Sequence, residues 1–246
     1  MSRRQTRATF SKPDFNSLFL KHVAASYEKQ LYLSEIVQNK SWALDKQSGL
    51  LTFGSGNDEI SFKAQILGTQ SDISNTWVWA WGNQASNFTA EVLVECGKLR
   101  QVGELNGIKE LTERKLECNE KINGHMLSMV ASGVCEANAY YRGPYEGGAV
   151  FLLIKDPKYP MDKSSLGNAI RIAQNFTEVI SKIDIYNHRD AIRSYFEYHK
   201  GTISEVSDSI TATFTNGESI SAKFLPNGLL EGMSTKIPNR NPAGHN

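Results

Sequence analysis

The segment NTWVWAWGN, residues 75–83, constrains the fold more than any other part of this chain, because it holds three of the four tryptophans at alternate positions. Alternate side chains of a β-strand point to the same face of a sheet. The spacing therefore predicts a strand in which Trp77, Trp79 and Trp81 share one face, while a valine and an alanine share the other. Since both faces are apolar, we expect the strand to be covered on both sides, or covered on one side and used for binding on the other.

Exposed together, the three indoles would form an apolar patch of roughly 450–750 Å², because each can bury about 150–250 Å². Soluble monomers seldom expose a patch at the top of that range unless it binds something. The first interpretation is therefore a buried core. The second is the wall of a cleft, since an indole N–H requires an acceptor and suits a place where one end of the ring meets a ligand. In that case Asn83 lies at the mouth of the cleft.

The composition allows a packed core and argues against a nucleic-acid partner. The chain has 246 residues, of which 40% are hydrophobic and 22% charged, enough for one large domain or two small ones. Six of its 27 basic residues lie in the first twelve and last fourteen positions, which leaves 21 basic against 26 acidic residues, a charge of about −5 for the body. Nucleic-acid binding depends on clustered Lys and Arg that neutralise phosphates, so we do not expect it here.

The sequence also predicts a cytoplasmic location. It contains no run of 18 apolar residues, and its charged N-terminus is not followed by an apolar stretch. We therefore expect neither a membrane span nor a signal peptide. The three cysteines, Cys96, Cys118 and Cys135, are an odd number without Cys-x-x-Cys spacing. This pattern argues against disulfides and zinc and predicts buried, reduced thiols.

Hydrophobic periodicity predicts several amphipathic helices. They cover residues 14–39, 87–102, 123–141, 164–183 and 189–199. Asp14 and Asn187 are the expected N-caps of the first and last of these helices. A cluster of small residues at 131–133 predicts that another element approaches the third helix closely.

Strand signals fall on both sides of these helices. Glycine-separated runs over residues 41–69 lead into the tryptophan strand and predict an antiparallel meander. The apolar run 149–156 indicates a central strand, preceded by a turn-forming loop, RGPYEGG, at 142–148. Four short strands end the chain, at 202–206, 209–215, 218–225 and 228–232. The Asn216-Gly217 and Asn227-Gly228 pairs between them predict hairpin turns with positive φ at both residues.

These elements indicate an α+β fold in which antiparallel β-meanders pack against amphipathic helices. Residues 51–68 and 212–228 both follow a helix and both run Thr-Phe, turn, Ile-Ser, lysine. A duplicated helix-plus-meander unit is one explanation of this similarity, and two independent hairpins are the other. We divide the chain into a disordered basic arm (1–13), a main domain (14–186), a C-terminal helix plus four-strand meander (187–232) and a disordered tail (233–246).

Common catalytic signatures are missing from the sequence. It contains no phosphate-binding loop, dinucleotide fingerprint, nucleophile elbow or zinc-protease pattern. The histidines have no second ligand at metal spacing, so we expect no metal and no cofactor. A pairing of Cys135 with His125 stays open, but Cys135 lies in an apolar helical pattern, which favours an inert thiol.

Four short segments resemble a known family. WALD (42–45), LTFG (51–54), WVWAWGN (77–83) and FLLIKDP (151–157) are together similar to a bacterial family known only as a domain of unknown function, marked by a Trp-x-Trp-Ala-Trp-x-Asn strand. The resemblance covers residues 15–200. It implies a bacterial or phage-like origin and a cytosolic domain, and it brings neither an activity nor catalytic residues.

We expect a non-catalytic binding or protein-interaction domain, and the alternative is a small-ligand-binding protein or enzyme with a cleft over the tryptophan strand. The sequence leaves the partner, an unknown protein or small molecule, and the oligomeric state open. The aromatic pair Tyr140 and Tyr141 beside Arg142 suits ligand contact and adds to the tryptophan strand. The candidate contact residues are Trp77, Trp79, Trp81, Asn83, Tyr141, Arg142, Tyr145 and Glu146.

Overall fold

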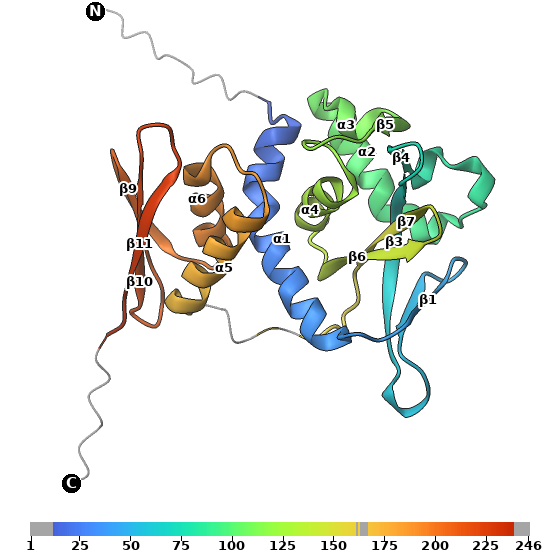
Figure 1. Ribbon diagram of the computed structural model, residues 1–246, viewed down its shortest axis with the longest axis horizontal. Helices are drawn as coiled ribbons and strands as arrows, with labels where there is room; N and C mark the ends of the chain where they lie inside the picture. Colours follow the sequence, from blue (N-terminus) through green and yellow to red (C-terminus); the bar gives the residue numbers. More distant parts are fainter. Residues whose placement is uncertain (1–11, 161, 163–166, 239–246) are drawn as a thin grey trace, which may run out of the picture.

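The computed structural model describes residues 12–160, 162 and 167–238, and its elements form layers that lie side by side in Figure 1. A four-stranded sheet is followed by helices α5 (Ala169–Lys182) and α6 (His188–Tyr198), then by α1 (Phe15–Val37), then by α4 (Gly124–Val134), and finally by a seven-stranded sheet. The predicted α+β fold with antiparallel meanders is confirmed. Most of the expected basic arm and the end of the expected tail lie outside the described residues.

Helix α1 is the central element. The Asp14 carboxylate accepts a hydrogen bond from Ser17 N, and Ser17 Oγ accepts one from Asp14 N, which confirms the predicted cap. One side of α1 packs on α4, and another side packs on α5 and α6. No described helix, α1 included, combines the length and apolarity needed to cross a membrane.

The seven-stranded sheet is antiparallel throughout. Its strands are β1 (Trp42–Asp45), β2 (Leu50–Phe53), β3 (Ile60–Ser71), β4 (Thr76–Trp79), β5 (Lys115–Glu117), β6 (Ala139–Tyr145) and β7 (Gly148–Ile154). Strand β7 pairs with both β3 and β6, and all of its residues are buried, so the predicted central strand is confirmed.

Strand β3 bends, so that the β1–β2 hairpin lies over the outer face of the sheet. Its first half pairs with β2, whereas its second half pairs with β4 and β7, and the register shifts between Ile66 and Gly68. The β1–β2 hairpin thereby reaches over β6. Trp42 lies so close to Gly143 that an added Cβ there would be 2.6 Å from its ring, and the Trp42 and Tyr141 ring centroids are 5.8 Å apart.

Two helix predictions need correction. The helix expected at 87–102 is instead α2 (Val94–Asn106), entered through a 3₁₀ turn at Ala90–Leu93, and the short α3 (Lys109–Thr112) follows it. The helix expected at 123–141 ends at Val134, because Glu136 adopts a left-handed φ of 51° and the chain then pairs with β7 as β6. The loop expected at 142–148 is therefore mostly strand, and only a tight turn remains around Gly147.

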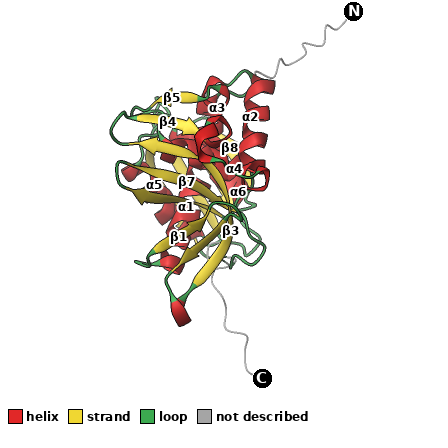
Figure 2. Cartoon of the chain, turned by 90° about the vertical axis from the view of Figure 1, so that its right-hand side faces the viewer, coloured by secondary structure: helices red, strands yellow, loops and turns green. Residues whose placement is uncertain are grey.

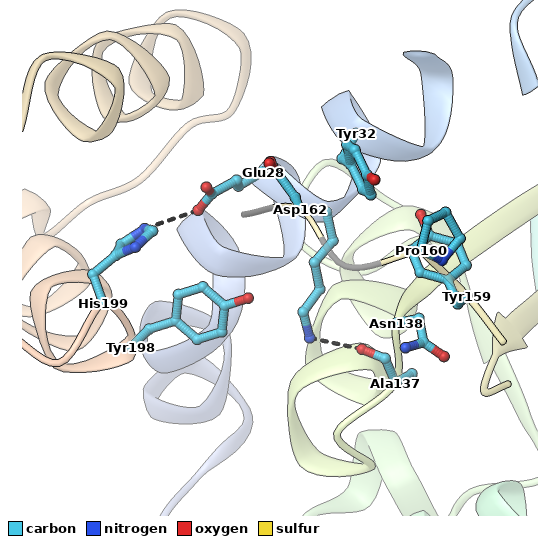
Figure 3. A pocket seen from close by; sticks show the side chains of 10 residues that line it. Glu28, Tyr32, Ala137, Asn138, Tyr159, Pro160, Asp162, Tyr198 and His199 are labelled. Atoms are coloured by element: carbon cyan, nitrogen blue, oxygen red, sulfur yellow. Dashed lines mark hydrogen bonds and ion pairs between the residues drawn. The ribbon is translucent and has the colours of Figure 1, made fainter. Parts of the chain in front are cut away.

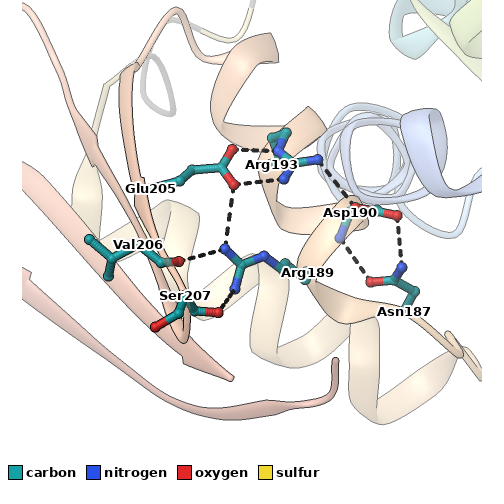
Figure 4. Close-up of polar contacts among 7 residues, drawn as sticks. All are labelled: Asn187, Arg189, Asp190, Arg193, Glu205, Val206 and Ser207. Carbon is teal, nitrogen blue, oxygen red and sulfur yellow. Dashed lines mark hydrogen bonds and ion pairs between the residues drawn. The ribbon is translucent and has the colours of Figure 1, made fainter. Parts of the chain in front are cut away.

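The C-terminal sheet is a four-strand meander, as predicted, with the order β11-β10-β9-β8. Its strands are β8 (Thr202–Val206), β9 (Ser209–Thr213), β10 (Ser219–Phe224) and β11 (Leu230–Lys236). Asn187 caps α6 as predicted, by accepting a hydrogen bond from Asp190 N. Figure 4 shows how α6 is fastened to β8: Arg193 contacts both oxygens of Glu205, at 2.6 and 2.7 Å, and Arg189 donates to the Val206 and Ser207 carbonyls.

Helix α5 and the last residues of β11 also belong to this layer. Helix α5 precedes position 187 but packs against β10 and β11, so it belongs to the same layer. Strand β11 extends to Lys236, beyond the expected start of the tail at 233, because it pairs with β10 along its whole length. In both Asn-Gly turns the glycine alone has positive φ, 82° in each case, so the turns are not of the predicted hairpin type.

The duplication hypothesis gains no support from strand register. Thr52 of β2 pairs with Ser61 of β3. Its counterpart Thr213 pairs with Ser219, although the sequence similarity would align Ser61 with Ser221. The two hairpins therefore have similar sequences but a different strand register, which favours independent hairpins.

Gly133 on α4 and Gly97 on α2 provide matched glycine-to-alanine tests of the α1–α4 contact. A Cβ added at Gly133 would lie 2.1 Å from Cγ of His22, whereas a Cβ at Gly97 would meet no atom within 4 Å. We expect Gly97→Ala to raise the free energy of unfolding by up to about 1 kcal/mol through helix propensity. Gly133→Ala should lower it by about 1–3 kcal/mol through overpacking. Urea titration measures both, and equal stabilisation would contradict the close approach predicted for residues 131–133.

His22 should make folding sensitive to mild acid. Burial, with smaller effects of Lys21 and Lys29, lowers its pKa from 6.5 to about 4. As the pH falls below 6.5, the unfolded chain therefore takes up a proton that the folded protein does not, and stability falls until the folded pKa is reached. We expect urea midpoints to decrease between pH 7 and pH 5, and His22→Gln to reduce this decrease. An unchanged pH dependence in the variant would contradict the role of His22.

Candidate functional site

The tryptophan segment is only partly a strand. Strand β4 ends at Trp79, and Ala80–Gly82 form a 3₁₀ turn in which Asn83 N donates to Ala80 O. Trp77 and Trp79 share the inner face, as predicted, and both are 0% exposed. Their ring centroids are 5.2 Å apart, and the Trp79 indole N–H donates to Glu110 O. These two residues are core side chains, and neither one offers a contact surface.

Trp81 lies beyond the end of the strand, in the 3₁₀ turn, which corrects the expectation of three alternating rings on one strand. The partner strand β5 pairs with Thr76–Val78 alone, and the chain turns away after Trp79. The Trp81 ring is half-buried, with the Arg100 guanidinium carbon 4.5 Å from its centroid. Trp77 and Trp79 are therefore core residues, and Trp81 packs against the same core from the turn that follows the strand.

The candidates near the 142–148 loop separate because they lie on one strand and point to alternate faces. Tyr141 packs on the outer face against Trp42 and Phe53, and Tyr145 lies on the same face. Arg142 lies 3.6 Å from Asp72. Glu146 is exposed at the hairpin turn. These candidates are neighbours in the sequence, but the alternation of side chains along the strand places them on different faces of the sheet.

Two of the candidates meet in a pocket of about 470 Å³ on the outer face of the sheet, which we call the Trp42 pocket. Figure 2 shows this sheet facing the viewer with α1 and α5 behind it. The pocket lies between β1, the β3–β7 surface and the segment after the tryptophan strand. Its apolar wall consists of Trp42, Ala43, Leu44, Phe88 and Val150, and its polar side chains are Lys46, Thr69, Asn83, Ser86 and Tyr145.

Most polar side chains of the Trp42 pocket make no hydrogen bond that would stabilise the fold. Among the described residues, the side chains of Thr69, Asn83, Ser86 and Tyr145 have no hydrogen-bond partner. Trp42 and Phe88 were missed as site residues by the sequence interpretation. Trp42 opens the WALD segment of the resemblance, which was the available signal, but Phe88 reaches the pocket only through the path of the chain after residue 83.

A second, smaller cavity of about 210 Å³ lies where α1 meets the end of α6 (Figure 3). Lys29 donates to Ala137 O at 2.7 Å, and burial lowers its pKa to about 8. Glu28 accepts hydrogen bonds from Tyr195 OH and His199 Nε2, at 2.8 and 2.9 Å. Because these groups bind one another, we interpret the cavity as a structural junction between α1 and the C-terminal layer.

The cysteines are free and buried, as predicted. Burial raises the pKa of the Cys96 and Cys135 thiols to about 12, so both stay protonated at neutral pH. His125 does not pair with Cys135: its Nδ1 lies 3.0 Å from Tyr140 OH, whereas Cys135 Sγ donates to Glu95 O. This pair therefore forms no nucleophile–base arrangement.

The fold and the site define an α+β protein whose larger antiparallel sheet is covered by helices on one face and carries the Trp42 pocket on the other. The chain belongs to a family of unknown function (DUF6882), whose model matches residues 16–157. The matched region is shorter than the expected 15–200 and ends just after β7, so α5, α6 and the C-terminal sheet lie outside it. Neither the curated proteins nor the solved structures contain a significant match to the chain.

Tryptophan fluorescence distinguishes the buried from the accessible indoles. Trp77 and Trp79 are fully buried, whereas Trp42 and Trp81 are half-buried. We expect acrylamide to quench part of the wild-type emission. The double variant Trp42→Phe/Trp81→Phe should lose the quenchable part and retain a blue-shifted emission. If the remaining emission is still readily quenched, then the burial of the β4 indoles is wrong.

Proposed function

We propose that this chain is a non-catalytic binding protein whose ligand contact is the Trp42 pocket. The observation that supports this function is the set of polar side chains, on an aromatic wall, that the fold leaves without partners. Such an arrangement, mostly apolar with a few placed polar groups, is typical of ligand pockets, and its volume falls within their usual range of about 300–1,000 Å³.

The lining residues indicate what kind of group would bind. Trp42, Phe88 and Tyr145 offer ring surfaces for a planar, largely apolar group. Asn83 offers both a donor and an acceptor for the polar edge of that group. Lys46 is the charged residue of the lining, so a neutral or weakly anionic ligand is favoured over a cation. The group is either a small molecule or an aromatic side chain of a partner protein.

Binding is favoured over catalysis because the described lining includes no His, Cys, Asp or Glu side chain. The hydroxyls of Thr69, Ser86 and Tyr145 are weak nucleophiles unless a general base such as His, Asp or Glu lies beside them. A cytoplasmic location belongs to the same proposal, since three buried free thiols suit a reducing compartment.

The test is ligand-observed NMR with indole, phenol and adenine as planar probes. We expect the wild-type protein to bind at least one of them, and Asn83→Ala and Tyr145→Ala to weaken that binding by about tenfold, the loss of about 1.4 kcal/mol of contact. Tyr186→Ala is the matched control, because Tyr186 is 60% and Tyr145 50% exposed and Tyr186 lies outside the pocket. Equal binding by all three variants would contradict the assignment of the pocket.

A further inference from the structure

A larger pocket of about 980 Å³ lies on the opposite, helix-covered side of the sheet, and we call it the Gln70 pocket. It is bounded by α1, the N-terminal end of α4, strand β6 and the C-terminal end of α5. Asn119 and His125 at its rim are exposed, so it is open to solvent. None of the ten residues of the Trp42 pocket lines it.

Three carboxamides of the Gln70 pocket are held in one orientation by backbone hydrogen bonds. Gln70 Oε1 accepts from Gly124 N at 2.7 Å. Asn119 Oδ1 accepts from both Lys121 N and Ile122 N, at 2.8 and 2.9 Å. Asn75 Nδ2 donates to Cys118 O at 2.9 Å. Each bond determines which end of the amide is the nitrogen and which is the oxygen.

The opposite ends of these amides remain for a ligand. Gln70 Nε2 and Asn119 Nδ2 are donors, and Asn75 Oδ1 is an acceptor, with no partner among the described residues. Gln30 Nε2 is also buried without a hydrogen-bond partner in the described part of the chain. A buried donor without an acceptor is costly, which indicates that something else, water or ligand, satisfies it.

Flat and apolar surfaces accompany the amides. The His125 ring packs edge-on against Phe151, with centroids 5.3 Å apart, and its Nδ1 contacts Tyr140 OH. Partial desolvation of the ring, with a smaller effect of Arg142, lowers the pKa of His125, which favours the neutral ring. Met126 and Met129 line the same pocket. Neutral rings and thioethers suit the face of a planar heterocycle.

The charges of the lining argue against an anionic ligand. They are those of Glu120, Lys182 and Asp184, which sum to a negative value. We propose that the Gln70 pocket binds an uncharged planar heterocycle with hydrogen-bond donors and acceptors on its edge, of the nucleobase or nucleoside class. This assignment does not depend on the function proposed for the Trp42 pocket.

Isosteric acid variants test the proposal without removing the bonds that hold the fold. Gln70→Glu and Asn119→Asp each keep the oxygen that accepts from the backbone and replace the unpartnered NH₂ donor by an oxygen. Calorimetric titration with adenosine, guanosine, cytidine and uridine should show binding of at least one nucleoside to the wild-type protein. We expect each variant to weaken that binding by about tenfold or more, because a donor becomes a repelling acceptor.

Gln101→Glu is the matched control. Gln101 is exposed on α2, and its substitution introduces the same negative charge away from the pocket. It should bind as the wild-type protein does. If Gln70→Glu fails to fold, Asn119→Asp in its exposed loop still decides the question. The proposal is overturned if no nucleoside binds, if the acid variants weaken binding no more than Gln101→Glu, or if Asn83→Ala in the Trp42 pocket abolishes the binding instead.

Discussion

Burial of α1 on two sides is the constraint on which the rest of the structure depends. Towards the seven-stranded sheet, the contact requires a residue without a Cβ, because Gly133 of α4 lies directly against His22. Towards the C-terminal layer, the contact is polar: Glu28 is 4% exposed and accepts hydrogen bonds from Tyr195 and His199 of that layer. A buried carboxylate is tolerated only with such partners, so the register of α6 on α1 is specified as well as its position.

The family match makes this arrangement informative. Residues 16–157 include α1 but not the helices that cover its second side. In this chain, the cover is supplied by α5, which packs on β10 and β11, and by α6, which Arg189 and Arg193 hold to β8. The C-terminal layer therefore completes the core of the matched region, and the buried residues of both parts form one continuous cluster.

Local signals in the sequence predicted local structure well. Asp14 and Asn187 are caps because their side chains satisfy free N–H groups of the first turn, and this requires no tertiary partner. The end of α4 could not be predicted in the same way. Residues 135–138 contain no glycine or proline, and the helix ends there because the chain pairs with β7, a contact between distant residues. The path of Trp81 depends in the same way on the short length of β5.

Only part of the candidate site could be predicted, because it too depends on contacts between distant residues. Asn83 and Tyr145 come together because β3 bends and the segment after β4 returns over the sheet, and neither event has a local signature. Trp77 and Trp79 attracted attention through their size, but two adjacent indoles on one strand are the residues that a core needs most. Smaller polar side chains without partners mark the pocket better, and only the tertiary structure shows which ones lack partners.

The two pockets share strands β3 and β6, since Tyr145 and Tyr140 of β6 line one pocket each. Thr69 lines the Trp42 pocket and its neighbour Gln70 lines the pocket behind the sheet, because consecutive side chains of β3 point to opposite faces. At these residues β3 is paired on both edges, with β4 and with β7, so the backbone between the pockets is held by hydrogen bonds on each side. A ligand in one pocket can affect the other by moving β3 or β6, and moving β3 would break pairing on both of its edges. The pairing of β3 therefore favours two sites that bind independently, although they share two strands.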